Sequence, residues 1–199
     1  MAFTAKDNNT VTFGLCDVKY AVLTYSETEK KYTIGDITSI PGAVELNMPA
    51  SGDEVEFYAD NTVYYADYTN TGYDGTLTIA KIPEQMLVDV FGFEQDSTGA
   101  IFEKSTAKTK EIAMWFQFDG DKNAKKNCFY RCKLSRPDVA GKTVEKTKTP
   151  ATAQLKIKAM PRQGDYLVKA SLPNDGSANY TAFDTKLPEP AAASTGAGG

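Results

Sequence analysis

Residues 55–93, VEFYADNTVYYADYTNTGYDGTLTIAKIPEQMLVDVFGF, decide the fold because strand, turn and helix signals follow one another within this stretch. Segments 55–59 and 75–82 are rich in β-branched and aromatic residues and partly alternate apolar with polar residues. This pattern is typical of half-buried strands. Turn residues at 70–72 and 74–75 predict that the chain reverses between the two segments. We expect the other strands of the chain to complete the sheet that these segments begin.

The same stretch predicts a short helix between Pro83 and Gly92. Proline suits the first helical position, and glycine suits the left-handed residue just past a helix end. A helix of roughly 13 Å, at about 1.5 Å per residue, is too short to be stable alone in water. We therefore expect it to lie on the sheet through one apolar stripe. The stripe consists of Met86, Leu87, Val90 and Phe91.

Two further segments, 112–118 and 154–160, alternate apolar and polar side chains as strands do. On the first, one face is expected in the core and the other face carries Trp115. On the second, Lys156 and Lys158 are expected to point outward. The expected core side chains of the two strands are Met114, Phe116, Phe118, Leu155 and Ile157.

The chain of 199 residues fits one β-rich domain, expected over residues 1–186. We expect residues 166–172 to pair with the strand at 154–160 across a turn. Residues 187–199, LPEPAAASTGAGG, have a low-complexity composition that predicts a disordered tail. The start, MAFTAKDNNT, lacks the charged and apolar regions of a signal peptide. We expect a soluble protein made in the cytoplasm.

The composition offers little catalytic chemistry, because the chain contains no histidine. Catalytic arrangements of Ser-His-Asp and Cys-His are therefore excluded. Cys128 and Cys132, four apart on one face of a predicted strand, are roughly 13 Å from each other, too far for a disulfide, so they and Cys16 are expected to be free thiols. Asp119 and Asp121 flank Gly120 as in an ordinary hairpin turn. We expect no enzyme, no cofactor and no metal site.

Charge is divided unevenly along the chain, although the net charge is only −4. Residues 1–100 contain 16 acidic and 5 basic side chains, whereas residues 101–199 contain 10 acidic and 17 basic ones. Such asymmetry fits a basic nucleic-acid surface, an intramolecular dipole, or two opposite faces that attract copies of the same molecule head to tail. A merely solvated surface is the simplest alternative.

A long polar excursion, residues 47–62, carries acidic side chains near its base. It fits an ordinary mobile hairpin or an arm that reaches a neighbouring subunit. If it is an arm, its contact residues are Asn47, Pro49, Gly52, Asp53, Glu54, Glu56, Tyr58, Asp60 and Asn61.

The order and spacing of several short motifs resemble the major tail proteins of long-tailed, non-contractile bacteriophages, over about residues 13–172. The motifs are Phe13-Gly14-Leu15 with Val18-Lys19-Tyr20-Ala21, Ile40-Pro41-Gly42-Ala43, Phe57-Tyr58-Ala59-Asp60-Asn61, Gly72-Tyr73-Asp74-Gly75, Ile82-Pro83-Glu84, Phe118-Asp119-Gly120-Asp121, and the run from Cys132 to Arg136-Pro137. The resemblance implies a mainly β tail-tube fold. Two packed antiparallel sheets would form a sandwich or partly closed barrel with one short flanking helix and a long protruding hairpin.

The resemblance also implies a function, a structural virion protein that closes into hexameric rings and stacks into the tail tube. Implied partners are the protein itself, a tape-measure protein in the lumen, and the tail terminator and distal tail proteins. Double-stranded DNA would pass without specific binding. From the uneven charge of the chain we expect acids to line the lumen, because a basic lumen would retain the duplex. The protein would assemble in the host cytoplasm and reside in the virion, with no membrane contact. The alternative is a monomeric β-sandwich that binds carbohydrate or a receptor through exposed Tyr or Trp115.

Overall fold

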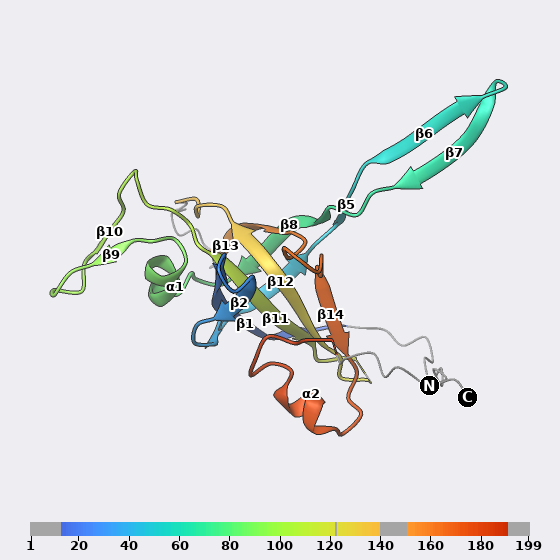
Figure 1. Ribbon diagram of the computed structural model, residues 1–199. Helices are drawn as coiled ribbons and strands as arrows, with labels where there is room; N and C mark the ends of the chain where they lie inside the picture. Colours follow the sequence, from blue (N-terminus) through green and yellow to red (C-terminus); the bar gives the residue numbers. More distant parts are fainter. Residues whose placement is uncertain (1–12, 122, 140–150, 191–199) are drawn as a thin grey trace, which may run out of the picture.

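The computed structural model describes residues 13–121, 123–139 and 151–190 (Figure 1). Antiparallel strands dominate it, and two short helices accompany them, which confirms the expectation of a mainly β protein. The elements in chain order are β1 (Leu15–Ser26), β2 (Lys31–Ile34), β3 (Thr38–Ser39), β4 (Ala43–Asn47), β5 (Ala50–Ser51), β6 (Glu54–Ala59), β7 (Thr62–Tyr68), β8 (Gly72–Ile79), α1 (Glu84–Asp89), β9 (Glu94–Gln95), β10 (Ile101–Phe102), β11 (Glu111–Phe118), β12 (Lys126–Leu134), β13 (Ala153–Ala159), β14 (Lys169–Leu172) and α2 (Ala178–Ala182).

The body is a single ten-stranded sheet rather than two separate packed sheets. Its main path runs β2-β1-β11-β12-β13-β8-β4, while β14 pairs with β12, β3 with β1, and β5 with β8. The short segment from β3 to β4 joins the two ends of this path, because β3 bonds to β1 and β4 bonds to β8. The turn between them is fixed by Ile40 N–H donating to Val18 (2.7 Å) and Ala80 N–H donating to Gly42 (2.8 Å). The two sides of the sheet are therefore connected around the body through the chain between β3 and β4.

The larger core cluster lies on the face that this circuit encloses, since it unites side chains of β1 and β8, which are far apart in the sheet order. Leu155 and Ile157 of β13 belong to it, as expected, and Lys156 and Lys158 point the other way. Its buried members are Val18, Tyr20, Ile40, Leu77, Ile79, Met86, Val90, Phe91, Ile112, Met114, Phe116, Phe129, Cys132, Leu134, Leu155, Ile157 and Ala159.

Helix α1 closes one end of this core, and its prediction is confirmed. Pro83 is the N-cap, and Gly92 has the positive φ of 73° expected just past the end. Met86, Val90 and Phe91 are almost completely buried, whereas Leu87 is partly buried. Val90 and Phe91 follow the last helical residue.

Strand β11 is buried on both faces, so the expectation of one core face was wrong. Met114 and Phe116 enter the larger cluster, and Ala113 and Trp115 enter a second one on the other face. The C-terminal segment covers this second face, which is why a sheet surface expected to meet water is dry. The buried members of the second cluster are Ala21, Leu23, Tyr32, Ala113, Trp115, Cys128 and Phe183.

The covering segment contains α2, a helix that the sequence analysis did not predict. Ser177 caps it by accepting a hydrogen bond from the Tyr180 N–H (3.2 Å). Beyond α2, Leu187 packs against the second cluster, and Glu189 forms an ion pair with Arg162 (2.8 Å). The segment expected to be disordered from residue 187 thus makes defined contacts at its start, while residues 191–199 lie outside the described part.

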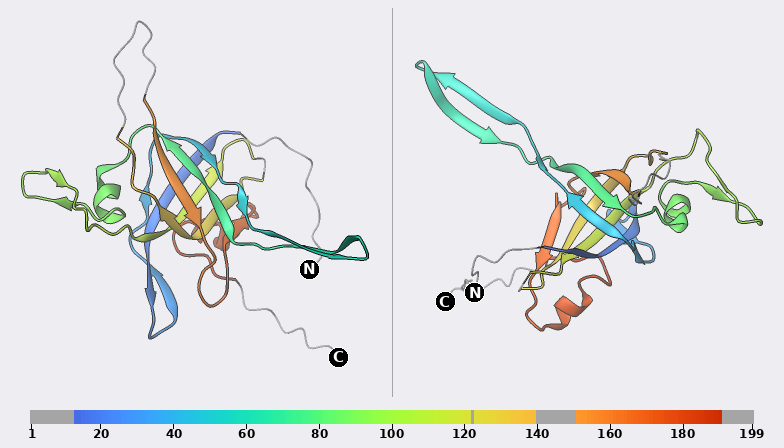
Figure 2. Two further views of the ribbon diagram at one scale, coloured as in Figure 1. Left: turned by 90° about the horizontal axis from the view of Figure 1, so that it is seen from above. Right: turned by 180° about the vertical axis from the view of Figure 1, so that it is seen from behind.

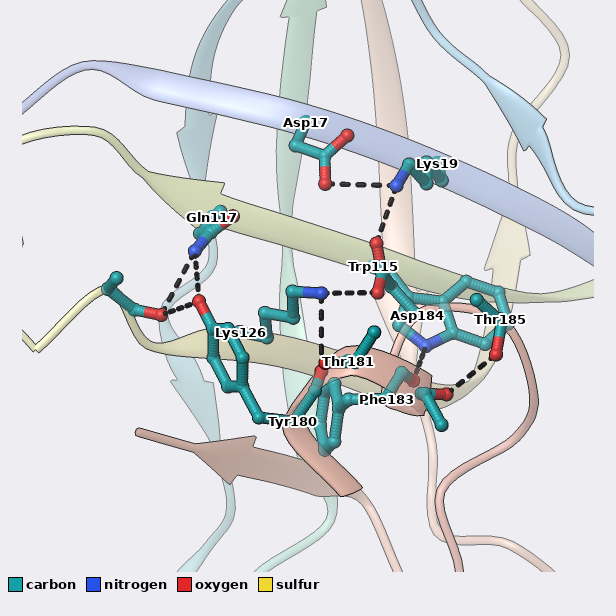
Figure 3. Close-up of polar contacts among 12 residues, drawn as sticks. Asp17, Lys19, Trp115, Gln117, Lys126, Tyr180, Thr181, Phe183, Asp184 and Thr185 are labelled. Atoms are coloured by element: carbon teal, nitrogen blue, oxygen red, sulfur yellow. Dashed lines mark hydrogen bonds and ion pairs between the residues drawn. The ribbon is translucent and has the colours of Figure 1, made fainter. Parts of the chain in front are cut away.

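A cluster of charges fastens α2 to the sheet (Figure 3). The two oxygens of the Asp184 carboxylate accept hydrogen bonds from Lys19 (2.6 Å) and Lys126 (2.5 Å). Lys19 also contacts Asp17 (3.0 Å), and the Trp115 indole N–H donates to the carbonyl of Phe183 (3.1 Å). We call Asp184, Lys19 and Lys126 the clasp, because they join the C-terminal segment to β1 and β12.

Three local expectations were wrong. Residues 72–75 do not turn the chain but lie inside β8, where a Cβ on Gly72 or Gly75 would come within 1.9 Å of a neighbouring carbonyl oxygen. These glycines permit close approach of adjacent strands. Strand β14 pairs with β12 rather than with β13. The segment at 55–59 is not part of the body sheet at all.

The cysteines are free, as expected, but Cys128 and Cys132 lie on opposite faces of β12. A register irregularity between Ile112 and Met114 on the paired strand breaks the alternation between them. Burial raises the pKa of both thiols. The Asp119–Asp121 segment forms a tight turn in which Asp121 accepts the Asn123 N–H (2.9 Å).

Candidate functional site

Strands β6 and β7 form a hairpin that projects far from the body, and we call residues 54–68 the arm (Figures 1 and 2). They pair with each other as a separate two-stranded sheet and form no ladder with the body. Asp60 and Asn61 make the turn at its tip, with positive φ values of 52° and 60°. This conformation matches the right-handed twist of paired strands and suits Asp and Asn.

The base of the arm is held by close hydrogen bonding between its two chains. The Thr69 N–H donates to the Asp53 carbonyl (2.9 Å), and the Asp53 N–H donates to Thr69 Oγ1 (2.8 Å). A Cβ on Gly52 would come within 1.7 Å of the Thr69 carbonyl oxygen, so only glycine fits there. The arm therefore leaves the body along a defined path.

The two faces of the arm differ in chemistry. Side chains alternate between the two faces along β6. On β7 a bulge at Tyr64, between the pairs Phe57↔Tyr65 and Tyr58↔Val63, shifts this alternation by one residue. The acidic face carries Glu54, Glu56, Tyr58, Val63 and Tyr68. The apolar face carries Val55, Phe57, Tyr64 and Tyr65, with Asp67 beside them.

Tyrosine hydroxyls hold the arm's carboxylates in place. Tyr58 donates to Glu56 (2.6 Å) and Tyr68 donates to Glu54 (2.7 Å) on the acidic face. These hydrogen bonds raise the pKa of both tyrosines. Residues 54–68 contain four acidic side chains and no basic one, so all charged side chains of the arm are negative.

The arm leaves large apolar groups in water. Its valine, phenylalanine and tyrosine side chains are between 44% and 73% exposed. An isolated two-stranded hairpin is at best marginally stable in water, and clustered exposed aromatic residues mark interaction surfaces. The arm therefore has the exposed apolar surface that is typical of contact sites.

The structure divides the predicted contact residues between body and arm. Asn47 ends β4 opposite Thr76, and the Pro49 carbonyl accepts the Asp74 N–H (3.1 Å), so both belong to the body. The rest follow the arm from base to tip: Gly52, Asp53, Glu54, Glu56, Tyr58, Asp60 and Asn61.

The returning strand β7 was missed, because the expected excursion ended at residue 62. The signal that could have found it is Asp60-Asn61, a two-residue turn between two runs of strand-forming residues. With that turn recognised, the hairpin extends symmetrically to Tyr68. The missed contact candidates are Val55, Phe57, Val63, Tyr64, Tyr65, Asp67 and Tyr68.

A smaller protrusion, the β9–β10 hairpin, lies on the opposite side of the body from the arm (Figure 2). It exposes Phe102 and carries an ion pair between Lys104 and Glu94 (2.6 Å). Asp96 organises its turn by accepting hydrogen bonds from Thr98 and Ala100. Within the described residues, the arm and the β9–β10 hairpin thus project from opposite sides of the body (Figure 2).

The described residues hold no group of three or more Cys, Asp or Glu side chains placed to bind a metal. Trp115 is 1% exposed and cannot serve as a binding platform. No helix in the described ranges is long and apolar enough to cross a membrane. A comparison with protein-family models finds no match, and neither does a comparison with curated protein sequences.

Proposed function

We propose that this chain is a structural phage protein that assembles into hexameric rings stacked as a tail tube. The resemblance over residues 13–172 suggests the family, and the β-rich body agrees with the fold class that it implies. The observation that carries the proposal is the arm, with apolar and acidic faces exposed in the single chain. A subunit that assembles with copies of itself needs an element of this kind, whose exposed apolar side chains are covered only by a neighbouring copy.

Self-assembly explains the arm better than a monomeric binding module does. The alternative relied on exposed Tyr or Trp115; Trp115 is buried, and most of the exposed tyrosines, Tyr58, Tyr64, Tyr65 and Tyr68, lie on the arm rather than on the body. A hairpin that joins the body only through its two chains is instead suited to lie along a second copy. Contacts of this kind, repeated around a ring and between rings, build a tube.

The remaining partners of the proposal are those that the resemblance implies. The lumen would hold a tape-measure protein and later conduct double-stranded DNA, while the ends would meet terminator and distal tail proteins. A wall that conducts DNA must not retain it, because each phosphate contact with Lys or Arg adds affinity. We therefore propose that acidic side chains line the lumen.

Removal of the arm tests the proposal. In the test variant, residues 54–68 are replaced by a two-residue Gly-Asn link, which keeps Asp53 and Thr69 in place. We expect wild-type protein to form rings or tubes in electron micrographs and the variant to remain a folded monomer by light scattering. The control, Val139→Ser, removes a fully exposed apolar side chain from the body and should assemble normally. Normal tubes from the armless variant would refute the role of the arm, and wild-type protein that stays monomeric at high concentration would refute the function.

A further inference from the structure

A group of lysines occupies the outer face of the sheet, away from the larger core. Lys156 and Lys158 alternate along β13 with the buried Leu155 and Ile157, and Lys133 lies beside them on β12. All three are exposed. We call Lys133, Lys156 and Lys158 the lysine face.

Two of these lysines are directly opposite each other, since Lys133 pairs with Lys158 in the β12–β13 register. Like charges at directly opposite positions destabilise a sheet. An anion placed over such a pair would relieve this repulsion.

The acidic residues nearest in register form no ion pair with these lysines. Glu111 lies opposite Lys133, but Arg131 holds its carboxylate through two hydrogen bonds (2.7 and 2.8 Å). Asp74 lies opposite Lys158 on β8. Lys133 donates to the carbonyl of Thr109.

The two lysines of β13 have no partner of their own in the described chain. Neither Lys156 nor Lys158 forms an ion pair or a side-chain hydrogen bond with residues 13–121, 123–139 or 151–190. The C-terminal segment covers the neighbouring part of the outer surface, over the second core cluster, and does not pack on this part. The described chain therefore leaves the lysine face free for an external anionic surface.

The acidic face of the arm has the matching pattern. Glu54 and Glu56 lie two residues apart on one strand face, as Lys156 and Lys158 do, so each pair spans roughly 6.6 to 6.8 Å. The hydroxyls of Tyr68 and Tyr58 hold both carboxylates in position. A strand laid along β13 would thus bring two carboxylates over two ammonium groups at once.

We propose that the acidic face of one copy's arm docks on the lysine face of a second copy. This inference rests on the proposed function, and it identifies the surface through which two subunits would make contact. The arm projects away from its own body (Figures 1 and 2), so the occupant is another copy. Donor and acceptor surfaces differ, which makes the contact head-to-tail and allows it to repeat without limit or close into a ring.

A charge exchange between two variants tests this contact. One variant carries Lys156→Glu and Lys158→Glu, and the other carries Glu54→Lys and Glu56→Lys. Each alone places like charges against each other, so the concentration needed for assembly should rise about tenfold or more. When the two variants are mixed in equal amounts, the acidic arm of the first can dock on the lysine face of the second. The basic arm of the second can dock on the new glutamates at positions 156 and 158 of the first. The mixture should therefore assemble as co-polymers.

Two controls separate this contact from general charge effects. Lys31→Glu with Lys81→Glu makes the same change of net charge at exposed positions outside the lysine face and should assemble like wild type. The milder pair Lys156→Gln and Lys158→Gln should weaken assembly less than the glutamates do. Circular dichroism melting confirms that every variant is folded.

The outcomes distinguish this inference from the function on which it rests. Normal assembly of the Lys156→Glu, Lys158→Glu variant refutes the docking and leaves the proposed function standing. Failure of the mixture to assemble also refutes it. Loss of duplex DNA binding by that variant, with assembly unchanged, would assign the lysine face to nucleic acid instead. A wild-type chain that never assembles overturns both proposals.

Discussion

The clasp predicts a measurable and pH-dependent contribution to stability from one carboxylate. Asp184→Asn keeps the shape of the side chain and removes its charge. The Asp184 side chain is 11% exposed, and those of Lys19 and Lys126 are 20% and 16% exposed, so all three are largely shielded from water. In the variant, two cations would face an amide oxygen that can satisfy only one of them well.

The magnitude follows from the two hydrogen bonds that the carboxylate accepts. A hydrogen bond to a charged group contributes about 1.5 to 3 kcal/mol, and the two share one carboxylate and are not additive. We therefore expect a loss of about 2 to 4 kcal/mol in the free energy of unfolding at pH 7. For a chain of this size this corresponds to a fall in Tm of roughly 4 to 16 °C.

The pH dependence has a definite sign. Burial by itself would raise the pKa of Asp184, but the hydrogen bonds from Lys126 and Lys19 outweigh it and lower the pKa below its usual value. A carboxyl with a lowered pKa stabilises the fold above its unfolded pKa of about 3.9. That contribution is lost as the pH falls through the lowered pKa. The difference between wild type and Asp184→Asn should be constant from pH 7 to pH 5 and vanish in acid.

Thermal unfolding followed by circular dichroism across this pH range is the assay. Asp36→Asn is the matched control, because Asp36 lines the same surface groove as Lys19 and Asp184 but is exposed. It should change stability by less than about 0.5 kcal/mol. Equal melting temperatures for wild type and Asp184→Asn at pH 7 would refute the clasp, as would a difference that persists unchanged in strong acid.

Two other predictions concern the core. Phe116→Ala, which removes a ring stacked on Phe129 (5.4 Å between centroids), should cost about 3 to 5 kcal/mol in denaturant unfolding; an unchanged midpoint would place Phe116 outside the core. In the native protein a thiol reagent should modify only the half-buried Cys16, because Cys128 and Cys132 are buried with raised pKa values. All three thiols should react in denaturant, and rapid modification of all three in the native state would contradict the burial.

Local patterns predicted the elements that depend on local chemistry. Pro83 and Gly92 bracket α1 through backbone preferences that act whatever the rest of the chain does. The alternation of Leu155 and Ile157 with lysines set the faces of β13, because only one face of that strand is covered. For these elements the physical cause of the structure lies in nearby residues of the chain, so the sequence pattern predicts them.

Elements whose surroundings are supplied by distant residues could not be predicted in the same way. Val55 and Phe57 look like half-buried strand residues, but no part of the body reaches the arm to cover them. The second face of β11 is covered by the C-terminal segment, in which Phe183 lies 68 residues after Trp115. The clasp joins Asp184 to Lys19, which is 165 residues away, and no spacing in the sequence predicts such a contact.

The attachment of the arm decides how a mechanical load would pass through the molecule. The two chains of the arm run into β5 and β8, and Figure 1 shows that they continue the line of these strands. Strand β8 is bonded to β13 along seven residue pairs, from Ala153↔Ile79 to Ala159↔Tyr73. A pull on the tip would therefore slide β8 lengthwise against β13, so that many hydrogen bonds resist together instead of opening one after another. Tension applied to the tip is thereby borne by the pairing of β8 with β13.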